Sequence, residues 1–114
     1  MKSNEKQQIK QILIGAKALI QKGWTRGSFF NDGRYCLDGA LMQAGGSDVR
    51  GDMVKHGSID ENRILAKAEG YLYSVLNNYQ TSMSIISFND QQKTKKPVLD
   101  LLTKAIERLE NEER

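Results

Sequence analysis

The sequence predicts an all-α fold: a small four-helix domain with a short central helix and two long surface loops. Apolar residues recur at three- and four-residue spacing in four stretches, helix start and stop signals flank these stretches, and glycine-rich segments connect them. Because 114 residues is about the length of one domain, we expect a single helical unit over residues 1–114 with its core at about 5–110.

The first predicted helix runs from about Glu5 to Lys22, and Gly23 is expected to end it in the left-handed conformation. Trp24, which follows, is expected to pack as a lid on the core. A connector is predicted from Thr25 to Arg34, in which Asn31-Asp32-Gly33 is a turn signal compatible with a small hairpin. The first helix should bury Ile9, Ile12, Leu13, Ala16, Leu19 and Ile20.

A short second helix of mostly small residues is predicted from about Cys36 to Ala44. Gly39 lies in its middle at a cost of about 1 kcal/mol relative to alanine, so we expect another segment to pack directly over it. This helix is predicted to be the central and most buried one, with a packing hub formed by Trp24, Cys36, Gly39 and Leu41. The following segment, Gly45 to Gly57, is predicted to be a long loop, and its sequence is compatible with a turn of helix around Asp52 to Lys55.

The third helix has the clearest start in the chain, because Ser58 and Glu61 match a capping box. Its apolar stripe comprises Ile64, Leu65, Ala68, Tyr71, Leu72, Val75, Leu76 and Tyr79, and it should end in the polar residues 77–82. For the apolar segment Met83 to Phe88, periodicity alone does not distinguish an extended segment from one helical turn, and an extended or irregular segment is favoured. A fourth helix should begin after Thr94 as its cap, and it should bury Val98, Leu99, Leu102, Ala105, Ile106 and Leu109.

Composition excludes several classes of protein. The net charge of +3 and a pI near 9.0 give a basic bias weaker than that of a dedicated DNA-binding protein. A single cysteine rules out an internal disulfide, and no apolar run reaches the roughly 18 residues that a bilayer requires. The chain begins without an apolar signal sequence, so we expect a soluble cytoplasmic protein that needs no cofactor.

Three motifs in order carry a resemblance: a Trp-x-x-Gly turn, a Cys-x-x-Gly-Ala-Leu helix and an aromatic-Asn-Asp-x-x-x-Thr helix entry. The sequence resembles a family of small bacterial and phage helical proteins of unknown function over about Ile9 to Leu109. The resemblance implies a helical fold and no particular activity. The chain departs from the family pattern at Phe88, where the pattern leads us to expect tryptophan. The matching residues are Trp24, Gly27, Cys36, Gly39, Ala40, Leu41, Asn89, Asp90 and Thr94.

Catalytic chemistry has one candidate, a nucleophilic Cys36 with His56 as its base and Asp38 as the group that orients it. The alternative, a small buried cysteine, is favoured because one residue of each type is weak support. A metal site is not expected, since one cysteine and one histidine are too few for a structural zinc site. No phosphate-binding or dinucleotide-binding glycine motif is present.

The function we favour from the sequence is a non-enzymatic protein-binding module, and a phage-encoded inhibitor or modulator of a host defence protein is its most concrete form. Aromatic and arginine residues dominate interface energetics. The predicted binding residues are therefore Arg26, Phe29, Phe30, Arg34, Asp52, Lys55 and His56. Lys93, Lys95 and Lys96 at the start of the fourth helix form a candidate anion site, which leaves weak nucleic-acid or phosphate binding open. Homodimerisation also stays open, and no membrane partner is expected.

Overall fold

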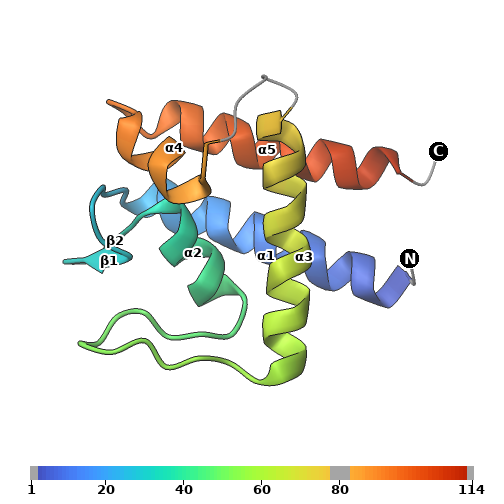
Figure 1. The fold of residues 1–114 in the computed structure, drawn as a ribbon, viewed down its shortest axis with the longest axis horizontal. Coiled ribbons are helices and arrows are strands. Elements are labelled where there is room, and N and C mark those ends of the chain that lie inside the picture. The colour runs from blue at the N-terminus through green and yellow to red at the C-terminus, as the bar shows by residue number, and fades with distance from the viewer. Residues whose placement is uncertain (1–2, 78–82, 113–114) are drawn as a thin grey trace.

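The computed structural model describes residues 3–77 and 83–112, where the chain forms five helices and one two-stranded sheet (Figure 1). The prediction of a mostly helical domain is confirmed, but the number of helices is wrong by one. The helices are α1 (Ser3–Lys22), α2 (Leu37–Ala44), α3 (Ile59–Asn77), α4 (Ile85–Gln91) and α5 (Lys96–Asn111). The strands β1 (Phe30–Asn31) and β2 (Arg34–Tyr35) pair in antiparallel register as the predicted hairpin.

The long helices α1 and α5 run antiparallel, and α3 crosses both of them (Figure 1). On one side of α3, the short helix α2 packs against α1, and α4 contacts α2. The expectation that α2 is the most buried helix is confirmed, because four of its eight residues are buried and none is exposed. The central position is shared: α2 contacts α1, α3 and α4, while the longer α1 contacts α2, α3 and α5 and buries Ile9, Leu13 and Ala16 completely.

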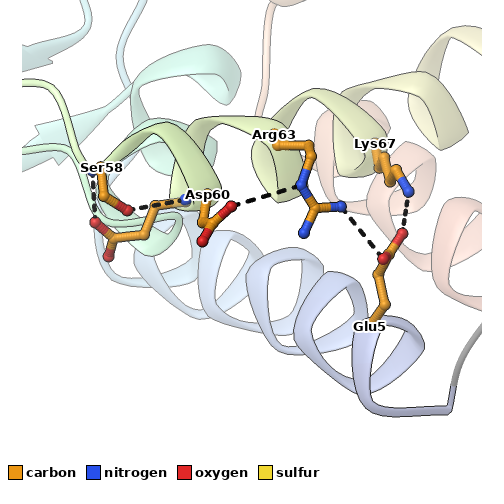
Figure 2. Close-up of polar contacts among 6 residues, drawn as sticks. Glu5, Ser58, Asp60, Arg63 and Lys67 are labelled. Atoms are coloured by element: carbon orange, nitrogen blue, oxygen red, sulfur yellow. Dashed lines mark hydrogen bonds and ion pairs between the residues drawn. The ribbon is translucent and has the colours of Figure 1, made fainter.

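Polar contacts fix the start of α3 and tie it to α1 (Figure 2). The predicted capping box is present: the Ser58 amide donates to Glu61 Oε1 at 2.8 Å, and the Glu61 amide donates to Ser58 Oγ at 3.1 Å. Further along α3, Arg63 and Lys67 both bind the carboxylate of Glu5 in the first turns of α1. The hydrogen bond from Lys67 is the main reason that the pKa of Glu5 lies below its ordinary value.

The segment predicted as extended, residues 83–88, instead enters α4. Ser84 is its N-cap, since its hydroxyl oxygen accepts a hydrogen bond from the Ser87 amide at 3.0 Å. The reason for the helix lies in its buried face, where Ile85, Phe88 and Asn89 follow helical spacing toward the core. A lone strand would have left its backbone groups unpaired.

Two predicted helix ends are also corrected. Gly23 does not take the left-handed conformation; a β-carbon there would lie 3.1 Å from the Gly33 carbonyl oxygen, so this glycine allows the hairpin to come close. Thr94 is not the cap of the last helix, because α5 begins at Lys96 and its N-cap Lys95 makes no side-chain capping bond. Pro97 lies in the first turn, where its missing N–H has no cost.

The loop between α2 and α3 is pinned in its middle, where the backbones of Asp48 and Lys55 exchange hydrogen bonds of 2.8 and 2.9 Å. The long loop is present as predicted, but the helical turn considered for residues 52–55 does not form, since these residues belong to the loop tip and its bridge. Buried Ser47 and Val49 anchor the base of the loop, and Met53 at the tip is 80% exposed. The predicted stripe residue Tyr79 and the end signals after Asn77 lie outside the described residues.

None of the helices described in residues 3–77 and 83–112 combines the length and the apolar character needed to cross a membrane.

Candidate functional site

A buried amide side chain, that of Asn89 in α4, joins three segments of the chain. Its Oδ1 accepts hydrogen bonds from Trp24 Nε1 at 2.7 Å and from the Leu37 amide at 3.0 Å. Its Nδ2 donates to the Thr25 carbonyl and to Asp90 Oδ1, both at 3.1 Å. All four hydrogen-bonding positions of the amide are thus used, and α4, the start of α2 and the segment after α1 are held in one fixed arrangement.

The next residue, Asp90, extends this network toward the surface. Its Oδ1 also accepts a hydrogen bond from the Gly27 amide at 3.1 Å. Arg26 reaches past it, and its Nη1 donates to the Gln92 carbonyl at 3.0 Å while its guanidinium carbon lies 5.9 Å from the Trp24 ring centroid. Arg26, a predicted binding residue, is therefore exposed but already engaged within the molecule.

Cys36 is the N-cap of α2, and its Sγ accepts a hydrogen bond from the Gly39 amide at 3.3 Å. Burial is the main cause that raises the pKa of its thiol, and the carboxylates of Asp38 and Asp90 raise it further. This setting favours the protonated thiol and opposes the reactive thiolate. His56 is exposed on the loop, and among the described residues no hydrogen bond joins it to Cys36.

The expected close packing over Gly39 is present, and the backbone of Phe29 makes it. A β-carbon on Gly39 would lie 2.0 Å from the Phe29 carbonyl oxygen, which also accepts a hydrogen bond from the Cys36 amide at 3.2 Å. The other residues of the predicted hub lie where packing requires them, with Leu41 fully buried and Trp24 half-buried.

A pocket of about 360 Å³ opens between the segment before β1 and helix α4. We call it the Phe29 pocket. Its walls are mainly apolar, and the side chain of Ile86 beside it is 46% exposed. The lining residues are Gly27, Ser28, Phe29, Cys36, Ile86 and Asp90. Of the predicted binding residues, only Phe29 is in this set.

The remaining predicted binding residues lie on the hairpin and on the α2–α3 loop. Phe30 in β1 is half-buried and packs edge to face against Tyr35, with ring centroids 5.0 Å apart. The hairpin and the loop extend on the same side of the molecule in Figure 1. The pKa of Arg50 in the loop is raised mainly by Asp48, and Tyr35 of the hairpin makes a smaller contribution. The exposed members are Arg34, Asp52, Lys55 and His56.

The three lysines of the candidate anion site differ in their contacts. Lys95 Nζ donates to the Gln21 carbonyl at 2.7 Å, at the C-terminal end of α1, where a cation is favourable. Lys96 pairs with Asp100 at 2.9 Å. Lys93 is exposed. Two of the three charges are therefore already used inside the molecule, which weakens the anion-site hypothesis.

A carboxyl pair between α2 and α3 is not predictable from the sequence pattern, because its members are distant along the chain. Asp38 Oδ1 is buried, and no N–H donor among the described residues reaches it. The pKa of neighbouring Glu69 is raised to about 8, mainly by burial and then by hydrogen bonding with Asp38 and by the charge of Asp38. A protonated Glu69 supplies the donor that Asp38 lacks.

Metal binding gains no support, because the described side chains include no group of three or more His, Cys, Asp or Glu residues that could hold an ion.

Residues 4–108 match the family described as a family of unknown function, DUF6197. The chain belongs to that family. No curated protein and no solved structure matches the chain. The match to DUF6197 includes the Asn89 network and every residue that lines the Phe29 pocket, while a bacterial or phage origin of the family stays a prediction.

Proposed function

We propose that the protein is a non-enzymatic module that binds another protein through one face. That face consists of the Phe29 pocket, the β1–β2 hairpin and the loop of residues 47–58. The observation that carries the proposal is the apolar Phe29 pocket with half-exposed Ile86 at its edge, held in place by the Asn89 network. Interfaces take most of their binding energy from a few anchors in such preformed pockets.

The loop supports the same face. Met53 is 80% exposed at its tip, although the loop is held by the Asp48–Lys55 bridge and is not a free coil. A polarisable and adaptable methionine on a held loop is typical of surfaces that receive a protein. Exposed Arg34 and half-buried Phe30 belong to the hairpin, which is part of this face.

The most concrete form of this proposal is a phage-encoded inhibitor or modulator of a host defence protein. The family resemblance is the only support for this form. The protein-binding face described above is the same whichever protein the partner is. A second copy of the chain also remains among the candidate partners.

The two alternatives have less support. A Cys36-dependent enzyme requires a thiolate, and the raised pKa of this thiol opposes one. If Cys36 were catalytic, iodoacetamide at neutral pH would modify it much faster than free cysteine. Nucleic-acid binding through the lysines would require free ammonium groups, but Lys95 already donates to the Gln21 carbonyl and Lys96 already pairs with Asp100.

Partner capture with a matched pair of variants tests the proposal. Ile86→Lys places a positive charge at the edge of the Phe29 pocket and removes its apolar edge, while Ile14→Lys makes the same change at an equally exposed position of α1, 47% against 46%. We expect the wild type and Ile14→Lys to retain the same partner and Ile86→Lys to bind it at least about 30-fold more weakly, as for a disrupted anchor. Identical capture by all three proteins, or capture of nothing, would overturn the proposal.

A further inference from the structure

The Phe29 pocket contains one carboxylate with an unused oxygen. The Gly27 amide and Asn89 Nδ2 both donate to Oδ1 of Asp90, which fixes the orientation of the carboxylate. Within residues 3–77 and 83–112, no hydrogen bond or ion pair reaches Oδ2 of Asp90. The pocket therefore offers one strong acceptor beside apolar walls.

The charge of this carboxylate is not neutralised by the pocket itself. None of the residues that line the pocket is a lysine or an arginine. The neighbouring Arg26 is directed to the Gln92 carbonyl and the Trp24 ring. Asp38 adds to the negative potential, because both it and Asp90 contribute to the raised pKa of Cys36.

A wholly apolar occupant would bury the Asp90 carboxylate without a partner, which is costly, and an anion would be repelled. An alkyl chain that ends in a cation satisfies both parts of the pocket. Its stem contacts Phe29 and Ile86, as the stems of basic side chains commonly do on apolar surfaces, and its charged end reaches Asp90.

We propose that the Phe29 pocket binds a lysine side chain of the partner protein, with its ammonium group on Oδ2 of Asp90. Lysine fits better than arginine because an ammonium is a point charge that one oxygen can receive, whereas a bidentate guanidinium needs both oxygens. Oδ1 already accepts two hydrogen bonds. This inference rests on the proposed function and names the chemistry of its partner.

The test uses small probes on the 114-residue chain. n-Butylammonium copies the end of a lysine side chain, n-butylguanidinium copies arginine, and 1-butanol has the same stem without charge. We expect n-butylammonium to shift the amide NMR signals of Gly27 and Ser28 saturably and to slow the reaction of Cys36 with methyl methanethiosulfonate. Cys36 reports on occupancy of the pocket because it is the only cysteine and lines the pocket. Its raised pKa makes the reaction slow, so the rate with the probe is compared with the rate without it.

Two variants that each remove one carboxylate charge, one inside the pocket and one outside it, provide the test and its control. Asp90→Asn keeps an oxygen for the Gly27 amide but removes the charge, and we expect about fivefold weaker n-butylammonium binding, the range of a partly exposed ion pair. Asp100→Asn, the same change on α5 outside the pocket and outside the proposed face, should leave n-butylammonium binding unchanged. Equal binding of 1-butanol, stronger binding of n-butylguanidinium, or unaltered binding to Asp90→Asn would overturn the proposal.

The two proposals fail in distinguishable ways. Loss of partner capture by Ile86→Lys, together with no n-butylammonium binding to the wild type, would leave the protein-binding function intact and overturn the lysine inference. Binding of n-butylammonium that depends on Asp90, without any partner capture, would support a site for alkyl cations and overturn the protein-binding function.

Discussion

Gly39 shows at the scale of one residue how closely α2 meets the segment before β1. A β-carbon there would lie 2.0 Å from the Phe29 carbonyl oxygen, and a backbone atom cannot swing aside as a side chain can. We therefore expect Gly39→Ala to lower the free energy of unfolding by about 1–3 kcal/mol, the usual cost of overpacking. Urea unfolding followed by Trp24 fluorescence measures it.

Gly70 provides the matched control, because it also lies inside a helix but a β-carbon added there would have no neighbouring atom within 4 Å. Gly70→Ala should raise the free energy of unfolding by about 0.5–1 kcal/mol through helix propensity alone. Equal effects of the two substitutions would contradict the close contact at Gly39.

The carboxyl pair of Asp38 and Glu69 acts at the scale of elements, since it joins α2 to α3. The pKa of Glu69 is about 8 in the folded protein against an ordinary value of 4.5, so the folded state binds more protons between these values. The sign follows from linkage: the contribution to stability is complete below pH 4.5 and is lost as the pH rises through about 8.

Glu69→Gln removes this titration while leaving an amide that can donate to Asp38. We expect its free energy of unfolding to fall less than that of the wild type as the pH rises from 4.5 to about 8, measured by urea unfolding at successive pH values. Glu107→Gln, on an exposed residue of α5, should keep the wild-type slope. Parallel slopes for all three proteins would show that Glu69 titrates normally.

The elements also show what sequence patterns can predict. The long helices and the capping box at Ser58 are predictable because their signals are local: apolar spacing over several turns and two residues three positions apart. Helix α4 is harder to predict because seven residues show only one repeat of that spacing, although the cap at Ser84 is a usable signal.

The candidate site is harder to predict from the sequence than the long helices are. Phe29 is among the predicted binding residues, but Ile86 and Asp90 are not. Asp90 meets Gly27 across 63 positions of the chain, and tertiary packing alone makes this contact. Because the sequence pattern predicts an extended segment around Ile86, it cannot place the side of the pocket that α4 supplies.

At the scale of the whole molecule, one apolar cluster connects all five described helices, with contributions from both hairpin strands. We expect a single cooperative unfolding transition, so that Trp24 fluorescence and helical circular dichroism change at the same urea concentration. Gly39→Ala should shift both curves together. A fluorescence change that precedes the loss of helix would show instead that α4 and the segment after α1 unfold as a separate unit.

The antiparallel pairing of α1 and α5 has a practical consequence. It brings the first turns of α1 and the last turns of α5 to the same side of the molecule, opposite the β1–β2 hairpin (Figure 1). The ion pair of Lys10 and Glu110, 3.3 Å apart, joins the helices there. A sensor chip, a bead or a fused domain attached at either end will therefore leave the hairpin side directed into solution, and orientation will not mask the face on which partners are sought.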